Sequence, residues 1–432
     1  MSKNSRVKVY IPRKLEGKII RYLHSPEIIA VVGARQVGKS TLLRHIYEKI
    51  TKPKIFLDFE DPEVLSLFNE DIKAFAKVYV ENRDFVFLDE FQYAHEGGRK
   101  LKFLFDHYKA KILISGSSSL ELSFRISSYL VGRLFTFELF PLSFEEFLNF
   151  RFPEAPGLIT DYLKEKKSLP AALHRRLLEL VNEFIIYGGY PRVAVAEDEE
   201  EKKVILKNLF STYLMKDIMG FFRISSEHPF QKFIKALALQ VGNLLRYSEI
   251  SSLTGLSFKE VKKYLEILEE TYIVKLCRPF FSNKRTELAK NPKVYFVDTG
   301  FRNYLLRDFS PVFERPDAGA LLENFVASEI MKAGAEFKLW RTKSGAEVDF
   351  VVDKGREIWA VEVKAGTKVR PGKALWSFIK KYNPSKAFIV YSGGLFYEKA
   401  GEAQVIYLPL YALGFALGAW EVLTFDRKGG GP

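Results

Sequence analysis

The sequence predicts an α/β protein with several domains, and three observations support this prediction. The chain has 432 residues, more than one hydrophobic core usually organises, so we expect two to four domains. Near the amino terminus, the β-branched run EIIAVVG leads through a glycine-bracketed loop into a helical pattern, STLLRHIYEKI. In the last third, two alternating strand patterns flank the turn DKG at residues 353–355, which predicts a hairpin.

Composition narrows the class of protein and its partners. Hydrophobic residues make up 47% and charged residues 28%, as in ordinary globular proteins. The formal charge of +13 is consistent with nucleic acid or another polyanion as a partner, although lysine-rich surfaces are also common in heat-adapted proteins. The one cysteine, Cys277, excludes disulfide bonds and cysteine-based zinc sites within a single chain, and this scarcity agrees with a reducing cytoplasm.

Neither a secretory signal nor a membrane span is expected. The start MSKNSRVKVYIPRK lacks the apolar run of a signal peptide. The longest uncharged stretch, residues 405–420, is too short for a comfortable span and contains Pro409. We read it as a buried strand followed by a helix, and we expect a cytoplasmic protein.

The loop GARQVGKST has the pattern of a phosphate-binding loop. Gly33 and Gly38 let the backbone curl and direct N–H groups at a phosphate, and the next helix adds its positive amino-terminal end. Lys39 would reach the β- and γ-phosphates. Ser40 would hold a Mg²⁺ ion, and Thr41 would add a contact near the α-phosphate. The loop therefore predicts a nucleotide site with Mg²⁺.

Three later segments supply the other parts of such a site. After the strand pattern DFVFL, Asp89 would bind the Mg²⁺ ion through its water shell, and Glu90 would polarise the attacking water. After the strand pattern KILISG, Ser117 or Ser118 would orient this water, and the sequence does not choose between them. Arg133 would stabilise charge on the nucleotide of its own chain or of a neighbour, and a salt-bridged surface arginine is the alternative.

Two helix patterns and a strand in the middle of the chain predict a winged helix-turn-helix. A short helix meets a turn at Gly255, and the capping box of Ser257 and Glu260 opens a second helix before the strand YIVKLC. Three lysines on the outer face of the second helix would meet DNA phosphates, although acidic neighbours equally allow a protein-binding or structural module. The side chains that we expect to pack together are Ile250, Leu253, Leu256, Val261, Leu265 and Leu268.

Acidic residues in the last third suggest metal-dependent chemistry. Alternate residues of a strand share a face, so Glu347 would project with Asp349, and Glu362 with Lys364. Asp349 and Glu362 would hold one or two Mg²⁺ ions that lower the pKa of a water. Lys364 would stabilise the pentavalent phosphate or orient the nucleophile. Glu323, on a preceding amphipathic helix, would complete the metal site or position Lys364. A hairpin with charged outer faces is the structural alternative.

Several segments together resemble a known family. GARQVGKSTLL, FVFLDEFQ, LISGSSS and VGRLFTFELFPLSFEEF occur in order, as in prokaryotic AAA-type P-loop ATPases with a C-terminal restriction-endonuclease-like domain. The resemblance covers nearly the whole chain and implies ATP as the nucleotide. The acidic residues and lysine of the last third resemble the Asp…(Asp/Glu)-x-Lys motif of these nucleases, although Val348 stands where many of them have proline.

The resemblance also implies a division into domains. A helical segment in the middle of the chain would pack over the nucleotide as a lid. The expected parts are an ATPase core at residues 1–145, a helical lid at 146–240, the winged helix-turn-helix at 241–285, a connector at 286–310 and a nuclease-like domain at 311–432.

Three functions remain open at the level of sequence. The first is an ATP-dependent DNA-processing enzyme with a metal-dependent nuclease domain. The second is a nucleotide-dependent switch or scaffold whose nuclease-like domain binds DNA or protein without cutting. The third is a chaperone-like machine that acts on protein. The oligomeric state also stays open, with a homo-oligomer among the alternatives.

Overall fold

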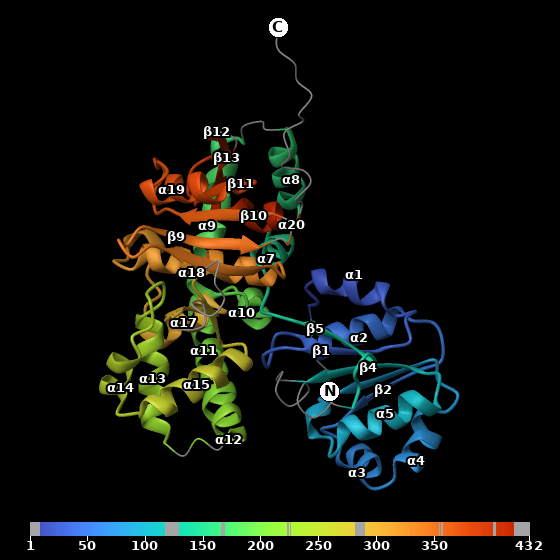
Figure 1. The fold of residues 1–432 in the computed structure, drawn as a ribbon. Helices are drawn as coiled ribbons and strands as arrows, with labels where there is room; N and C mark the ends of the chain where they lie inside the picture. Colours follow the sequence, from blue (N-terminus) through green and yellow to red (C-terminus); the bar gives the residue numbers. More distant parts are fainter. Residues whose placement is uncertain are drawn as a thin grey trace. The chain divides into compact units, whose positions relative to one another are not determined.

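A computed structural model describes residues 9–116, 129–165, 169–222, 224, 226–280, 290–353, 355, 357–400 and 403–418 (Figure 1). The chain divides into two compact units by its internal contacts. The amino-terminal unit comprises Met1–Leu142, Tyr190–Val195 and Glu266–Ile273, and the carboxy-terminal unit comprises Ser143–Gly189, Ala196–Leu265 and Val274–Pro432. Among the described residues, no helix is both long enough and apolar enough to cross a membrane.

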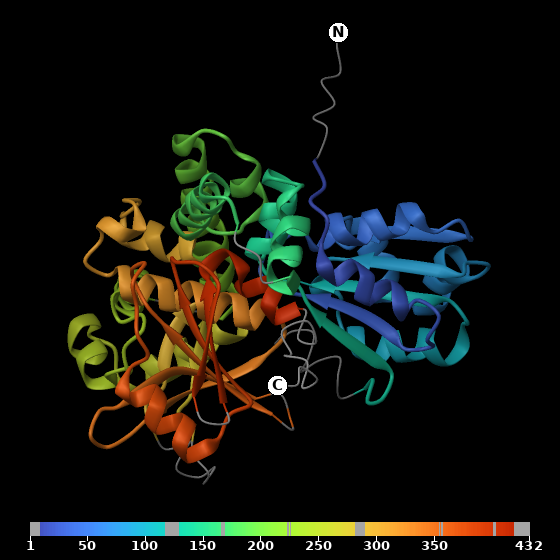
Figure 2. The same cartoon turned by 90° about the horizontal axis from the view of Figure 1, so that it is seen from above.

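The amino-terminal unit is built on a parallel sheet of five strands in the order β2-β3-β4-β1-β5. Every residue of β1, β3 and β4 is buried, as expected for strands covered on both faces. Figures 1 and 2 show helices on both faces of this sheet. The strands are β1 (Ile28–Val32), β2 (Lys54–Asp58), β3 (Phe85–Asp89), β4 (Lys111–Gly116) and β5 (Leu134–Glu138).

The order of the strands determines where the helices lie. The connection from β1 to β2 and the connection from β3 to β4 run in opposite directions across the sheet, so right-handed crossovers place α2 and α5 on opposite faces. The helical segments of this unit are α1 (Lys14–Arg21), α2 (Lys39–Lys49), α3 (Pro62–Glu70), α4 (Ile72–Phe75), η1 (Ala76–Val80), η2 (Phe91–Tyr93), α5 (Gly97–His107) and α10 (Pro191–Val195).

The first half of the carboxy-terminal unit is helical, as the sequence predicted for residues 146–240. Ser143 and Glu146 form the expected capping box at the start of α7. These segments are α7 (Phe144–Arg151), α8 (Ala155–Glu165), α9 (Ala171–Tyr187), α11 (Glu199–Leu209), η3 (Phe210–Ile218), α12 (Met219–Phe221), α13 (Glu227–Leu239), α14 (Tyr247–Thr254) and α15 (Phe258–Glu270). The end of α15, from Glu266, is assigned to the amino-terminal unit.

These helices pack on later parts of the chain within the same unit. The end of α9 is held by Asn303, whose amide donates to the carbonyls of Ile185 and Ile186 at 3.0 Å each. Asp298 accepts from the backbone N–H of Gly189 at 2.7 Å. Most of the segment that we expected to be a lid therefore shares a core with the C-terminal third.

Short elements connect this helical part to the last sheet. The strands β6 (Val274–Cys277) and β7 (Lys293–Phe296) pair antiparallel. The helical segments that follow are α17 (Thr299–Leu306), η4 (Val312–Glu314) and α18 (Ala318–Lys332). The helix predicted in GALLENFVASEIMKAG is present as α18. It is not amphipathic, because every residue from Leu321 to Ile330 except Glu323 is buried.

A mixed sheet of six strands forms the end of the unit, in the order β12-β13-β11-β10-β9-β8. The predicted hairpin is present, because β9 and β10 pair antiparallel. Residues 405–418 form the predicted buried strand and helix. The elements are β8 (Glu336–Arg341), β9 (Glu347–Asp353), β10 (Ile358–Val363), α19 (Lys373–Tyr382), β11 (Lys386–Tyr391), β12 (Phe396–Ala400), β13 (Ala403–Pro409), η5 (Leu410–Ala412) and α20 (Leu413–Gly418).

Candidate nucleotide and metal sites

The loop between β1 and α2 has the backbone that its glycines predicted. Gly33 has φ 152°, and a Cβ atom there would lie 2.1 Å from the carbonyl oxygen of Leu139. Gly38 has φ 99° and directly precedes the first residue of α2. Both positions need a residue without a side chain, so the loop and the amino terminus of α2 are fixed together.

Lys39 lies inside this loop. Its side chain is 5% exposed, and its ammonium donates to the carbonyls of Gly33 at 3.0 Å and Ala34 at 2.8 Å. Burial lowers the pKa of Lys39 to about 8, although the charges of Glu90 and Asp89 oppose this shift. The lysine is therefore held next to the backbone that would surround a phosphate.

Ser40 and Asp89 meet, as a shared Mg²⁺ site requires. The Ser40 hydroxyl donates to Oδ1 of Asp89 at 3.0 Å, although 49 residues separate them. Burial raises the pKa of Asp89, and the hydroxyls of Ser115 and Ser40 counteract this shift. Two predicted ligands of one ion thus come from the helix after β1 and from the end of β3.

Ser115 is a site residue that the sequence reasoning missed. Its hydroxyl donates to Oδ1 of Asp89 and accepts from the backbone N–H of Glu90 at 3.1 Å. It lies on β4, between β1 and β3 in the sheet, so it reaches the acidic pair from the strand itself. The sequence instead predicted that a serine after this strand, Ser117 or Ser118, orients the water. Ser117 and Ser118 lie outside the described residues.

Glu90 and Thr41 are the two other predicted residues of this site. Glu90 adopts a left-handed backbone with φ 53°, directly after β3, and its carboxylate accepts a hydrogen bond from the Gln92 amide. Its role as the residue that polarises water stays a prediction. Thr41 is exposed, one residue beyond Ser40 in the first turn of α2.

Arg133 lies at the amino-terminal ends of the strands, opposite the ends that carry the nucleotide loop. It directly precedes β5, its carbonyl accepts from the N–H of Ile28 at the start of β1, and its guanidinium pairs with Asp106 at 3.5 Å. The nucleotide loop follows the carboxyl end of β1, so about five residues of strand, or roughly 16 Å, separate the two. This arrangement argues against action of Arg133 on its own chain's nucleotide, and action on a neighbouring chain stays a prediction.

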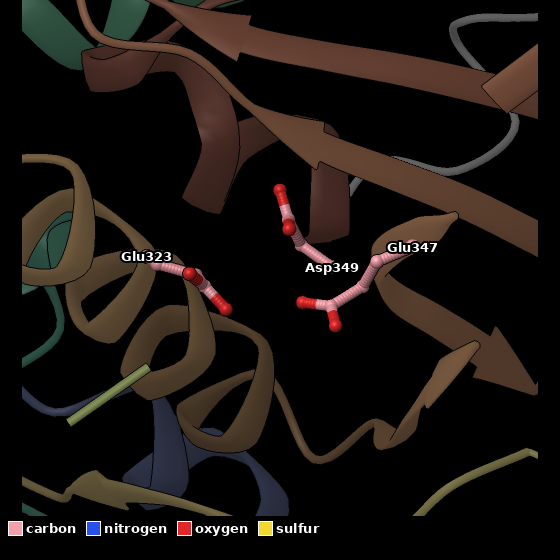
Figure 3. A group of neighbouring side chains, drawn as sticks. All are labelled: Glu323, Glu347 and Asp349. Atoms are coloured by element: carbon pink, nitrogen blue, oxygen red, sulfur yellow. The ribbon is translucent and has the colours of Figure 1, made fainter. Parts of the chain in front are cut away.

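Three carboxylates gather in the carboxy-terminal unit beside α18. Glu323 on α18 and Glu347 and Asp349 on β9 each offer an oxygen within 4.8 Å of the others (Figure 3). The sequence predicted this approach, because it placed Glu347 and Asp349 together and Glu323 near them. Burial, reinforced by the charge of Glu323, raises the pKa of Asp349, whose carboxylate accepts from the backbone N–H of Val363 at 2.7 Å.

Lys293, on β7, is a second residue that the sequence reasoning missed. Its ammonium lies 2.7 Å from Glu323 and 2.5 Å from Glu347, and its side chain is 3% exposed. Burial opposes its charge, but the two carboxylates raise the pKa of Lys293. The strand KVYF offered one signal, since a lysine that begins a wholly buried strand needs an acidic partner.

Glu362 and Lys364 do not join this cluster. As predicted, they lie together, with an ion pair of 2.6 Å. The Glu362 carboxylate also accepts from the N–H of Gly372, which directly precedes α19. Glu362 is not in the group of carboxylates whose oxygens lie within 4.8 Å of one another, but its charge helps to raise the pKa of Asp349. The pairing of Asp349 with Glu362 around one ion stays a prediction.

The cluster of three carboxylates fits one hard cation if the ammonium of Lys293 moves away. Carboxylate oxygens are the ligands that Mg²⁺ prefers, and two oxygens on one ion lie at most about 4.2 Å apart. The three carboxylates of Glu323, Glu347 and Asp349 would therefore close slightly around an ion. The ammonium of Lys293 would also have to release Glu323 and Glu347.

The segment predicted as a winged helix-turn-helix has the predicted elements. The helices α14 and α15 are joined at Gly255, Ser257 and Glu260 exchange the hydrogen bonds of a capping box, and the β6–β7 hairpin follows. One expectation for its packing is wrong, because Leu253 is 59% exposed. No contact in this segment tests whether it binds DNA.

Three family models match parts of this chain. Residues 25–148 match a family model described as an AAA domain. Residues 178–311 and 318–411 match two separate models, each described as a domain of unknown function.

Relatives occur in archaea and bacteria. An uncharacterized protein of Methanocaldococcus jannaschii is 29% identical, over 86% of this chain and 82% of its own length. Uncharacterized proteins of Haemophilus influenzae and Mycobacterium tuberculosis are 26% and 24% identical, over 80% and 88% of this chain and 84% and 80% of their own lengths.

Solved structures give weaker likenesses. A Walker-type ATPase of Pyrococcus abyssi covers 69% of this chain and 96% of its own, with 16% identity and a TM-score of 0.45. The Orc1 protein of Aeropyrum pernix, solved in complex with DNA, covers 69% of this chain and 93% of its own, with 14% identity and a TM-score of 0.29. Scores at this level carry no argument about function. The match of residues 25–148, together with the parallel sheet and the loop after β1, supports an AAA-type ATPase domain in this part of the chain.

Proposed function

We propose that this protein binds and hydrolyses ATP and acts on DNA through a metal-dependent centre in its carboxy-terminal unit. The ATPase part rests above all on the contact between Ser40 and Asp89, because these residues would have to share one Mg²⁺ ion. The position of Lys39 inside the loop supports the same reading. Bound Mg²⁺ would neutralise charge that develops on the phosphates.

The roles of the chain's own residues follow from their positions. The N–H groups of the loop and the amino terminus of α2 would hold the phosphates. Lys39 would exchange its backbone carbonyl partners for phosphate oxygens. Glu90 would orient the attacking water, and Ser115 would keep the acidic pair in place through its two hydrogen bonds.

ATP turnover tests this part of the proposal. Glu90→Gln should retain ATP binding but reduce turnover by roughly a hundredfold or more, because the water loses its base. Lys39→Ala should lose both binding and turnover. Normal turnover in either purified, folded variant would refute the assigned roles.

The nuclease part rests on the approach of Glu323, Glu347 and Asp349. Asp349→Ala should remove Mg²⁺-dependent cleavage of DNA while ATP turnover persists. Asp353→Ala is the matched control, since Asp353 ends the same strand and is exposed. Equal loss in both variants would mean that damage to β9, and not loss of a metal ligand, explains the result.

The alternative is a nucleotide-dependent switch with a non-cutting module, and one observation favours it. Lys293 already pairs with two of the three carboxylates, and Glu362 pairs with Lys364 and is not in the cluster. The switch predicts slow ATP hydrolysis and no cleavage with any divalent metal.

A further inference from the structure

We propose that Lys293 is an internal cation that competes with a metal ion for Glu323 and Glu347 and so determines the metal affinity of the carboxylate cluster. This inference rests on the proposed metal centre. It gives that centre a residue that limits metal binding.

The contacts of Lys293 make this competition direct. Its ammonium bonds to Oε1 of Glu323 and Oε1 of Glu347, and both of these carboxylates belong to the cluster of three. A divalent ion that uses these oxygens would lie within a few ångströms of the ammonium. At such a distance two like charges in a partly buried site repel strongly, so the ion and the ammonium exclude each other.

The surroundings hold the lysine in place. The Tyr295 hydroxyl donates to the same oxygen of Glu323, and Arg341 pairs with the other oxygen of Glu347 at 3.2 Å. The Glu323 and Glu347 side chains are 14% and 21% exposed, so their charges are only partly screened by water. Removal of Lys293 would leave two neighbouring carboxylates without their shared cation, which is the condition under which a metal ion binds well.

Lys293 and the carboxylates come from different elements. Lys293 begins β7, where it pairs with Cys277 of β6 in a two-stranded hairpin, whereas Glu347 and Asp349 belong to the six-stranded sheet. The position of the ammonium therefore depends on the hairpin and on a flexible side chain of four methylene groups. The same carboxylates can meet either the lysine or an ion without rearrangement of their own sheet.

Lys202 provides a matched control. It also pairs with a glutamate, Glu183, at 2.6 Å, and its side chain is 5% exposed, but this pair lies outside the cluster. Replacement of Lys202 removes the same charge from the same unit without freeing Glu323 or Glu347.

The test is titration with Mn²⁺ alone, without nucleotide, with free Mn²⁺ measured by electron paramagnetic resonance. Lys293→Met should bind Mn²⁺ at least tenfold more tightly than the wild type, because a repelling charge is lost and two ligands are freed. Lys202→Met should not differ from the wild type in Mn²⁺ affinity. Any Mn²⁺ bound at Ser40 and Asp89 is common to all variants and cancels in the comparison. In the Lys293→Met background, Asp349→Asn should abolish the gain.

Lys293→Gln and a thermal-shift measurement guard against a folding defect. Both Lys293 variants should melt lower than the wild type without metal and recover with Mn²⁺. Unchanged or weaker Mn²⁺ affinity in the folded variants would overturn the inference. Variants that are unfolded and that Mn²⁺ does not restore would also overturn it, because Lys293 would then have only a structural role. If the Lys293 variants bind Mn²⁺ more tightly but the protein does not cleave DNA, the nuclease function is refuted and this inference stands. If the protein cleaves DNA but the Mn²⁺ affinity of the variants is unchanged, this inference is refuted and the nuclease function stands.

Discussion

At the scale of single residues, Gly33 shows how strictly the nucleotide loop constrains its side chains. A Cβ atom there would lie 2.1 Å from the Leu139 carbonyl, and the backbone is in a region that favours glycine. Gly33→Ala should therefore weaken ATP binding by more than tenfold, as measured by calorimetric titration. Gly17→Ala is the control, because nothing lies within 4 Å of that added atom, and this helix substitution should stabilise the protein by about 0.5–1 kcal/mol. ATP binding of normal affinity in Gly33→Ala would contradict the geometry.

The charge of Asp317 contributes to the stability of the folded protein. Burial alone would raise its pKa, but hydrogen bonds and charge from Arg315 and Arg302 lower the pKa of Asp317 to about 2. The folded state therefore favours the ionised form, and this stabilisation is complete above the unfolded pKa near 4 and is lost as the pH falls towards 2. Because the Asp317 side chain is 29% exposed, screening by water reduces this contribution to roughly 1–2 kcal/mol at neutral pH.

Asp317→Asn should remove this contribution. The variant should unfold at lower urea concentration at pH 7, and the difference from the wild type should shrink between about pH 4 and pH 2. Asp308→Asn should have a smaller effect, since Asp308 contacts Arg315 at 3.4 Å and its side chain is more exposed, 35% against 29%. A difference that is independent of pH would exclude the ion pairs as its cause.

Residues of the two sites differ in how well the sequence predicts them. Gly33, Lys39 and Ser40 are recognisable because their chemistry depends on neighbours in one short loop. Ser115 and Lys293 were missed because their contacts arise only when distant segments fold together, with 26 residues between Ser115 and Asp89 and 30 between Lys293 and Glu323. Isolated serines and lysines have many other uses, so neither type is conspicuous alone.

At the scale of elements, two helices begin with the same capping box in different surroundings. Ser143 is buried and exchanges hydrogen bonds with Glu146, and Ser257 does the same with Glu260 on the surface. Ser143→Ala should lower the free energy of unfolding by about 1–2 kcal/mol and Ser257→Ala by about 0.5 kcal/mol, because only the buried cap leaves donors without water. Urea unfolding followed by circular dichroism measures both, and a larger loss at Ser257 would be inconsistent with this reasoning.

At the same scale, strict alternation of side chains fails along β9. The register between β8 and β9 shifts near Lys338 and Trp340, and Val348 and Val351 both join the core under α19 although they are three residues apart. Such an irregularity redirects side chains of β9, and alternation in a sequence does not reveal where it occurs.

At the scale of the whole molecule, nucleotide binding should stabilise only part of the protein. The loop and its acidic partners all belong to the amino-terminal unit. ATP with Mg²⁺ at a hundred times its dissociation constant should stabilise that unit by about 2.7 kcal/mol. Differential scanning calorimetry should show an upward shift in the wild type and none in Lys39→Ala. The same shift in Lys39→Ala would place the nucleotide elsewhere.

The organisation of the whole chain was only partly accessible from its sequence. The parallel sheet of the first part follows from strand and loop patterns that are local. The grouping of helices from residues 143–189 with the C-terminal third depends on buried contacts such as those of Asn303 and Asp298, which no local pattern predicts. The resemblance to a family suggested domains in chain order, whereas the compact units interleave along the chain.

A single DNA-cleavage assay tests the proposed function best. Linear, single-stranded and branched DNA would be incubated with Mg²⁺ or Mn²⁺, with and without ATP, and with the wild type, Lys39→Ala and Asp349→Ala side by side. We expect metal-dependent cleavage that Asp349→Ala abolishes, and a difference between the wild type and Lys39→Ala that is present only when ATP is added. Absence of cleavage in every sample, while the wild type still binds DNA and hydrolyses ATP, would refute the nuclease function and leave the nucleotide-dependent switch.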